Sequence, residues 1–187
     1  MTVVKAAPPR VCFADLERWP DDGRRYELYD GEVYVVPSPI LLHQIVSARL
    51  YLALEKYTRT LGGIVLYAPL DIVLTEFDVV QPDLLLFTRE RQHLLKLRSV
   101  TRHAPDLAIE ILSPSTAGND RGRKLPLLAR HAVREYWLVD PDAVRIEVYE
   151  LTGDRFALAS DAGPSDVVRS PLLPELSIAP GDLVPRE

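Results

Sequence analysis

The chain has 187 residues, of which 47% are hydrophobic and 26% charged, with a net charge of −5 and an isoelectric point of about 5.4. This length suits one sizeable core, so we expect a single domain over residues 1–187. The acidic balance argues against indiscriminate nucleic-acid binding, and no stretch approaches the roughly 18 apolar residues of a membrane helix. Residues 1–9 lack the pattern of a secretion signal, and Cys12 is the single cysteine, so we expect a cytoplasmic protein.

The N-terminal part of the sequence predicts a short helix and then a β-hairpin. Apolar residues recur at a helical interval over residues 13–19. Two β-rich runs between residues 26 and 36 flank Asp30-Gly31, a strong signal for a two-residue hairpin loop. With that loop, Glu27 and Glu32 project from the same face of the hairpin.

A long helix is predicted from about Ile40 to Leu61. Ser38 is its expected N-cap, with proline at the first helical position, and Gly62-Gly63 ends it. His43 lies beside the apolar stripe of this helix, one turn from its start. From there it could face the edge of a sheet, although a lone helical histidine is more often a packing residue.

Two strands are expected next, over residues 64–74 and 79–87. The second contains Asp83 inside an apolar run, where a buried strand normally carries another aliphatic residue. Residues 88–103 are basic with little periodicity, which predicts an exposed connection with one helical turn at most.

The strand over residues 105–112 has the same peculiarity, because Glu110 interrupts its apolar run. A buried carboxylate costs several kcal/mol unless it is paired, hydrogen-bonded or bound to a metal ion. Its presence therefore needs a functional or structural reason.

The remainder of the chain predicts one more helix, three strands and an extended tail. Asn119 or Asp120 can cap a helix that reaches about His131 and carries many basic residues. Strands are expected at residues 135–139, 145–151 and 155–159, followed by a proline-rich tail over 161–187 that lies against the body, so that the core spans 13–159. The whole order predicts an α/β fold with a central mixed sheet.

Asp83 and Glu110 lie on successive strands of this sheet. Neighbouring strands are about 4.8 Å apart, so two carboxylates on one face can share a divalent cation. Asp106 lies on the face of Glu110, but four residues separate the two by roughly 13 Å, too far for one ion. Oxygen ligands without cysteine favour Mg²⁺ or Mn²⁺ and do not support zinc.

Several blocks in this order resemble one known family. They are Gln81-Pro82-Asp83, the run from Pro105 to Thr116, the block from Asp120 to Lys124, and Glu135 to Pro141, with Tyr26-Glu27-Leu28, Asp30-Gly31-Glu32, Pro37-Ser38-Pro39 and His43-Gln44 before them. Together they resemble the Uma-two family of bacterial restriction endonucleases, a branch of the PD-(D/E)XK nuclease superfamily. The resemblance implies a restriction-endonuclease-like fold over roughly residues 13–159.

It also implies metal-assisted hydrolysis of a nucleic-acid phosphodiester, with DNA as the expected substrate. Asp83 and Glu110 would hold Mg²⁺ or Mn²⁺. The superfamily's lysine, two residues beyond its acidic residue, falls on Leu112, so the resemblance implies that Lys124 on the next helix replaces it. Lys124 would orient the attacking water or stabilise charge on the phosphate. Without the resemblance, a solvent-facing lysine is the better interpretation.

Further site residues follow from the same resemblance. Glu27, ahead of Glu32, could complete the metal shell, although surface-facing hairpin acids are the ordinary alternative. The remaining candidates are expected to contact substrate: His43 and Gln44 beside the site, and Arg121, Arg123 and Arg130 as phosphate contacts.

Two other functional classes stay open. The first is a nuclease-fold module with weak or no activity that binds nucleic acid or a protein, although such a module has no need of a buried carboxylate pair. The second is a small-molecule enzyme, for which the sequence carries no phosphate loop or catalytic triad. A homodimer would suit cleavage of both strands of a duplex.

Overall fold

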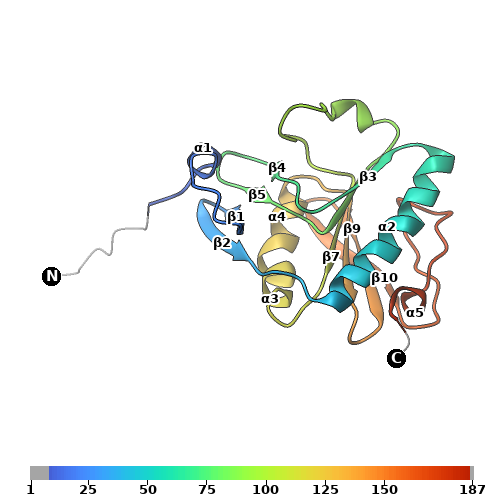
Figure 1. Cartoon of the computed structure of the whole chain (residues 1–187). Helices are drawn as coiled ribbons and strands as arrows, with labels where there is room; N and C mark the ends of the chain where they lie inside the picture. The colour runs from blue at the N-terminus through green and yellow to red at the C-terminus, as the bar shows by residue number, and fades with distance from the viewer. Residues whose placement is uncertain (1–8, 186–187) are drawn as a thin grey trace.

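The computed structural model describes residues 9–185 and contains two β-sheets (Figure 1). The larger sheet has six strands in the order β10-β9-β8-β7-β6-β3, antiparallel except for the β7–β8 pair. The smaller has the order β2-β1-β5-β4. The predicted mixed α/β fold with an N-terminal hairpin is confirmed. The strands are β1 (Arg25–Tyr29), β2 (Glu32–Val36), β3 (Ile64–Tyr67), β4 (Ile72–Val73), β5 (Val79–Val80), β6 (Leu84–Phe87), β7 (Leu107–Ile111), β8 (Glu135–Asp140), β9 (Arg145–Thr152) and β10 (Arg155–Ala162).

The hairpin has the predicted register. Asp30 and Gly31 both have positive φ, at 53° and 80°, as a two-residue loop that matches the strand twist requires. Glu27 therefore lies opposite Tyr34, and Tyr29 lies opposite Glu32. Both glutamates project from one face, as expected.

The prediction of two continuous strands over residues 64–74 and 79–87 is wrong, because each run forms two separate short strands. The chain passes from the large sheet to the small one between β3 and β4, and returns between β5 and β6. Pro69 and Pro82 lie at these two crossings. Proline has no backbone N–H and cannot continue a hydrogen-bonded ladder, so each run is divided there.

Helix α2 (Leu41–Leu61) packs across one face of the large sheet. Its buried residues Val46, Leu50 and Leu54 recur every four positions and contact the sheet. The predicted cap at Ser38 is wrong, because Ile40 keeps extended backbone angles and is the N-cap, so the helix begins at Leu41. Gly62, with φ 88°, ends the helix as predicted.

The opposite face is covered by a helical segment over residues 117–130. It comprises α3 (Ala117–Asn119), a π-helical stretch over Asp120–Lys124 and α4 (Leu125–Arg130). Leu127 and Leu128 pack on the even-numbered side of β7, where Ala108 and Leu112 lie. Glu110 belongs to that side of the strand by alternation, so its carboxylate faces the 117–130 segment.

The C-terminal tail completes the core on the α2 face. Val168, Leu173 and Ile178 are buried there, and the Val168 N–H donates to the Ile178 carbonyl at 2.9 Å. Glu135 is also buried and accepts a hydrogen bond from the Ser170 hydroxyl at 2.7 Å. The tail thus packs against the body of the protein. Three short helices complete the fold: α1 (Phe13–Leu16), a 3-10 turn (Gln92–Leu94) and α5 (Pro180–Leu183), the last of which the sequence did not predict.

Between residues 9 and 185 the structure contains no helix with the length and apolar character needed to cross a bilayer.

Candidate active site

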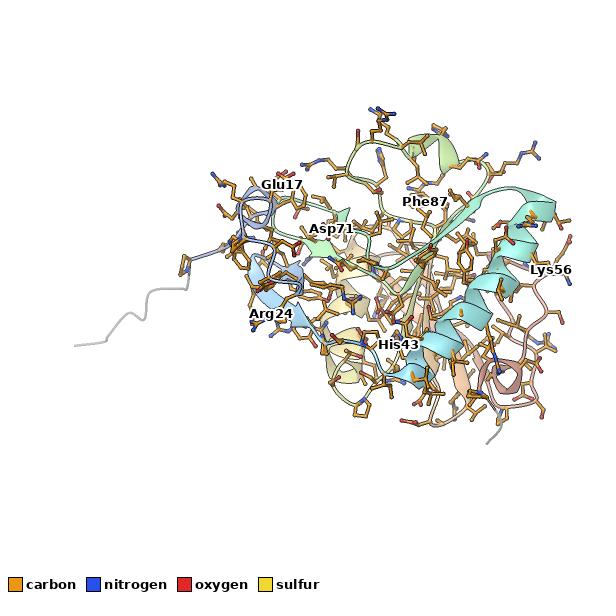
Figure 2. All side chains as sticks on the ribbon, viewed as in Figure 1. Glu17, Arg24, His43, Lys56, Asp71 and Phe87 are labelled. Carbon is orange, nitrogen blue, oxygen red and sulfur yellow. The ribbon has the colours of Figure 1, made fainter. Side chains whose placement is uncertain are left out.

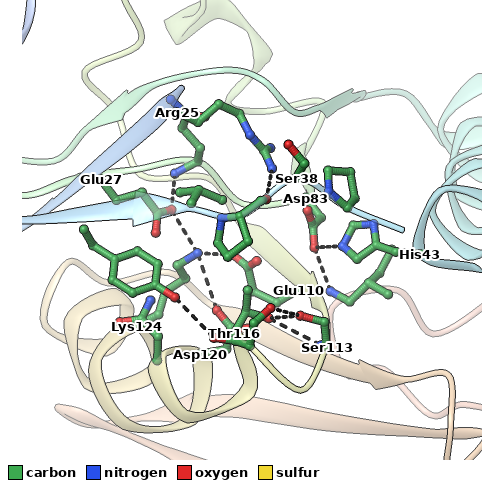
Figure 3. Close-up of a pocket in the computed structure, with 18 of the residues that line it drawn as sticks. Arg25, Glu27, Ser38, His43, Asp83, Glu110, Ser113, Thr116, Asp120 and Lys124 are labelled. Atoms are coloured by element: carbon green, nitrogen blue, oxygen red, sulfur yellow. Dashed lines mark hydrogen bonds and ion pairs between the residues drawn. The ribbon is translucent and has the colours of Figure 1, made fainter. Parts of the chain in front are cut away.

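A cavity of about 180 Å³ lies between the hairpin, the start of α2 and the 117–130 segment (Figure 3). We call it the acidic pocket. Its charged lining residues come from four separate parts of the chain and are Arg25, Glu27, Asp83, Glu110, Asp120 and Lys124. Carboxylates therefore outnumber the basic groups around this cavity.

Asp83 and Glu110 meet across neighbouring strands, as the sequence predicted. Leu84 pairs with Ile109, so the antiparallel register carried one step further places Asp83 opposite Glu110. Asp83 lies just before β6, where its Oδ2 accepts the Ile111 N–H at 2.9 Å and contacts His43 Nε2 at 3.0 Å. These contacts hold the Asp83 carboxylate at the end of the strand that carries Glu110.

Lys124 reaches this pair from the opposite side. Its Nζ lies 2.8 Å from Glu110 Oε1 and 2.9 Å from Glu27 Oε1, and the side chain is almost fully buried. Burial alone lowers the pKa of a lysine, but Glu110 and Glu27 raise the pKa of Lys124 well above its usual value. The ammonium is therefore a fixed positive charge between two carboxylates.

Asp120 and Lys124 enter the pocket from the two ends of the π-helical stretch. A π turn contains one more residue than an α turn, and such insertions occur often at functional sites. Here Asp120 and Lys124 are both buried, with Nζ 3.7 Å from Asp120 Oδ1. The residues between them on the same stretch, including Arg121 and Arg123, are exposed.

Asp120 is a site residue that the sequence interpretation missed, since it was assigned only a capping role. Its Oδ2 is buried and finds no hydrogen-bond partner among residues 9–185. Burial raises the pKa of Asp120 to about 6, and the charges of Glu27 and Asp83 add to this effect against the attraction of Lys124. The four-residue spacing from Lys124 was the available signal.

Glu27 is held by a hydrogen-bond chain that the sequence also did not reveal. The Tyr29 hydroxyl donates to Glu27 Oε2 at 2.6 Å and accepts from Asn119 Nδ2 at 2.8 Å. The Gln81 backbone N–H donates to Glu27 Oε1 at 2.7 Å. Glu27 is therefore buried and oriented, whereas Glu32 is exposed and pairs with Arg123.

The pocket as a whole carries more negative charge than its lysine can balance. Burial raises the pKa of Glu110 well above its usual value, and Asp120, Asp83 and Glu27 raise it further, against the opposing effect of Lys124. An additional cation would relieve this repulsion. The donors are hard carboxylate oxygens, which suit Mg²⁺ or Mn²⁺.

Across the described residues, no three His, Cys, Asp or Glu side chains already form a metal cage. Mg²⁺ commonly takes one or two carboxylates, keeps several waters and draws further ligands from a substrate phosphate, so it does not require a complete protein cage. Asp83 and Glu110 fit such a partial site.

The other predicted residues divide into two groups. His43 lies at the start of α2 (Figure 2). It lines the acidic pocket, and Gln44 lines a cavity beside it. Arg121, Arg123 and Arg130 are not among the residues that line the pocket, and their guanidinium groups contact Glu147, Glu32 and Asp78, respectively. All three arginines are exposed, and their contact with phosphate stays a prediction.

Asp106 has a structural role, in agreement with its predicted distance from Glu110. It is fully buried and accepts the Thr88 N–H at 2.8 Å and Arg91 Nη1 at 3.0 Å. These bonds anchor the start of β7 to the connection that follows β6.

Comparison with known proteins agrees with the fold and the motifs. The family model Uma2, described as "Putative restriction endonuclease", matches residues 13–181. This chain belongs to the Uma2 family. The match extends beyond the expected limit at residue 159, consistent with the packing of the tail into the core.

Two individual proteins are similar to this Uma2 chain. A Synechocystis sp. protein, named as uncharacterized, is 28% identical over 151 residues, which is 78% of this chain and 77% of the relative. A crystal structure from Anabaena variabilis, titled a "putative nuclease belonging to DUF820", superposes with a TM-score of 0.78 at 20% identity. It covers 92% of this chain and 97% of that one. The restriction-endonuclease-like fold predicted from the sequence is thereby confirmed.

The departure from the superfamily pattern at Leu112 has a clear structural counterpart in this Uma2 protein. Leu112 is buried in the apolar cluster beneath α4, so a lysine at that position would have to bury its ammonium among apolar side chains, at a high desolvation cost. Lys124 instead brings an ammonium within 2.8 Å of Glu110 from the adjacent helical segment.

Proposed function

We propose that this protein is a metal-dependent nuclease that hydrolyses phosphodiester bonds of nucleic acid, with DNA as the expected substrate. The observation that carries the proposal is the opposed pair Asp83 and Glu110 with Lys124 2.8 Å from Glu110, inside a pocket whose buried Asp120 oxygen is unpartnered within the described chain. Membership of the Uma2 family supports the same chemistry.

The charge of the pocket favours a metal requirement. Phosphate is an anion, and Glu27, Asp83, Glu110 and Asp120 would repel it from a cavity with few basic groups. Asp83 and Glu110 would hold Mg²⁺ or Mn²⁺. When bound, the ion supplies a Lewis acid for the phosphoryl oxygen and lowers the pKa of a water molecule.

The side chains of the chain itself would orient the reactants. Lys124 carries a fixed charge at the site and would stabilise negative charge that develops on the phosphate. Glu27, held by Tyr29 and the Gln81 N–H, is placed to fix Lys124. His43 holds Asp83 in position through the 3.0 Å contact.

A binding module without turnover is the second candidate. In its favour, Lys124 already forms ion pairs with Glu27 and Glu110, so these two carboxylates have a counter-charge without a metal ion. In that case the acidic pocket would be a structural ion-pair cluster and substrate would bind elsewhere.

A nuclease assay separates the two. Supercoiled plasmid, single-stranded DNA and RNA are each incubated with Mn²⁺ or with EDTA. Asp83→Asn keeps the shape of the side chain and removes its charge, so it should lower Mn²⁺-dependent cleavage at least about 100-fold, within the range that catalytic groups contribute. The matched control is Glu76→Gln, which removes an exposed carboxylate paired with Arg102 at the surface and should leave cleavage unchanged. Cleavage that survives Asp83→Asn indicates a contaminant, and absence of cleavage in every protein favours the binding module.

A further inference from the structure

A second cavity, of about 420 Å³, opens directly beside the acidic pocket and shares His43 and Asp83 with it. We call it the tyrosine groove. The residues that define it lie on α2 and at the end of β3 and are Gln44, Ser47, Tyr51, Leu52 and Tyr67. The two cavities therefore adjoin each other at His43 and Asp83.

Tyr67 is fixed next to Asp83 by the sheet itself. It ends the edge strand β3 and pairs with Leu84, and the following Ala68 N–H donates to the Asp83 carbonyl at 3.0 Å. Its ring meets Tyr51 edge to face, with centroids 5.2 Å apart and planes at 87°. Tyr67 is nevertheless 61% exposed, so its ring packs against Tyr51 while much of its surface stays accessible to solvent.

The helix side of the groove leads away from the acidic pocket. His43, Ser47 and Tyr51 are spaced by four residues and lie on one face of α2. Eight residues of helix span about 12 Å. That length corresponds to a few nucleotides of a stacked strand, which advances about 3.4 Å per phosphate. A phosphate beside Asp83 and His43 would thus place a nearby base at the tyrosines.

The chemistry of the groove differs from that of the acidic pocket and suits a nucleobase. Arg25 and Asp83 are the charged residues among its described lining, and both lie at the end shared with the acidic pocket. Farther along, Gln44 and Ser47 offer neutral hydrogen-bonding groups beside the aromatic rings. Bases of every type stack on tyrosine rings, whereas a base within a duplex already has both faces covered by its neighbours.

From this geometry we propose that the tyrosine groove binds an unpaired nucleobase of the strand whose phosphate enters the acidic pocket, stacked on Tyr67. The substrate class is therefore single-stranded or locally opened nucleic acid. The inference rests on the proposed nuclease function, because that function places the strand at Asp83. Leu52, which is 63% exposed, would also suit contact with a second copy of the chain, and the test distinguishes that occupant.

Binding is measured by fluorescence anisotropy in Ca²⁺, a hard cation that carboxylate oxygens also bind and that would offset the charge of the acidic pocket. Electrophoresis of each probe after the measurement checks that it is still intact. The probes are a labelled 12-nucleotide thymidine strand, an abasic strand of equal length and charge, and a 12-base-pair duplex. Wild-type protein should bind the thymidine strand about 5- to 150-fold more tightly than the abasic strand, the range that stacking of one base gives. Tyr67→Ala should lose this preference, and Tyr67→Phe should keep it. The matched control Leu158→Ala removes an apolar side chain that is 54% exposed on β10, the other edge strand, and should also keep it.

Three results overturn the inference: an equal base preference in wild type and Tyr67→Ala, no base preference, or no binding of either strand. Sedimentation that shows a dimer dispersed by Tyr67→Ala, without base preference, assigns the groove to a second copy and also overturns it. Cleavage measured in parallel keeps the two proposals apart. A base preference that depends on Tyr67, without any cleavage, supports the groove proposal and refutes the nuclease function. Cleavage that depends on Asp83, without a base preference that depends on Tyr67, supports the nuclease function and refutes the groove proposal.

Discussion

Replacement of Lys124 by methionine should destabilise the metal-free protein strongly. The Lys124 ammonium contacts Glu110 at 2.8 Å and Glu27 at 2.9 Å, and the residue is only 3% exposed. Methionine fills a similar volume but leaves those buried carboxylates without a counter-charge. Loss of one partner of a buried ion pair costs about 3–5 kcal/mol, a large part of the roughly 5–15 kcal/mol that stabilises a domain.

The measurement is urea unfolding at pH 7, followed by circular dichroism. Lys96→Met is the matched control, because Lys96 is exposed in the connection between β6 and β7 and its loss should change the free energy of unfolding by less than about 0.5 kcal/mol. The double variant Glu110→Gln with Lys124→Met should regain part of the loss, since it removes one of the unpaired charges. A Lys124→Met protein within about 1 kcal/mol of wild type would refute the reasoning.

Three further predictions address the charges around and outside the pocket. Asp120→Asn should stabilise the metal-free protein at pH 7.5 by about 1–3 kcal/mol, because the pKa of Asp120 is raised to about 6 and its ionisation above that pH opposes folding. Urea unfolding checks this: the midpoint of the variant should exceed that of wild type at pH 7.5, and the difference should vanish below about pH 4. Asp106→Asn should have the opposite pH dependence. Burial raises the pKa of the Asp106 carboxyl, but the hydrogen bonds from the Thr88 N–H and Arg91 outweigh burial and lower it. The contribution of Asp106 to stability, about 2 kcal/mol, is therefore present at pH 7 and lost as the pH falls below about 4, which thermal unfolding of wild type and variant at pH 7 and pH 3 checks. Arg121→Ala should reduce the slope of log affinity against log salt for DNA by about one if Arg121 contacts phosphate, whereas an unchanged slope assigns it to its ion pair with Glu147.

The sequence was sufficient for the parts of the site that follow from regular structure. Strand alternation and neighbouring position placed Asp83 and Glu110 together, and the observed register of β6 and β7 agrees. Asp30-Gly31 specified the hairpin register that turns Glu27 inward. Only the family resemblance predicted that Lys124 belongs to the site, because the sequence around it is typical of an exposed basic helix.

The remaining features depend on interactions that a local pattern does not contain. Asp120 was taken for a helix cap because the helix was expected to begin there, whereas the helical segment begins at Ala117, so that Asp120 lies inside it and beside Lys124. The division of two expected strands at Pro69 and Pro82 requires knowledge of a second sheet that can receive β4 and β5. Tyr29 is recognisable as an orienting residue only once Glu27 and Asn119 are seen on either side of its hydroxyl.

Nicking of supercoiled plasmid by wild type and Glu110→Gln, from matched preparations, tests the central claim most directly. Glutamine keeps the size of Glu110 and removes the charge that would face both the metal ion and Lys124. The account predicts nicking by wild type that requires Mg²⁺ or Mn²⁺, stops with EDTA, and falls at least about 100-fold in Glu110→Gln. Equal nicking by the two proteins, or nicking that persists in EDTA, would contradict it.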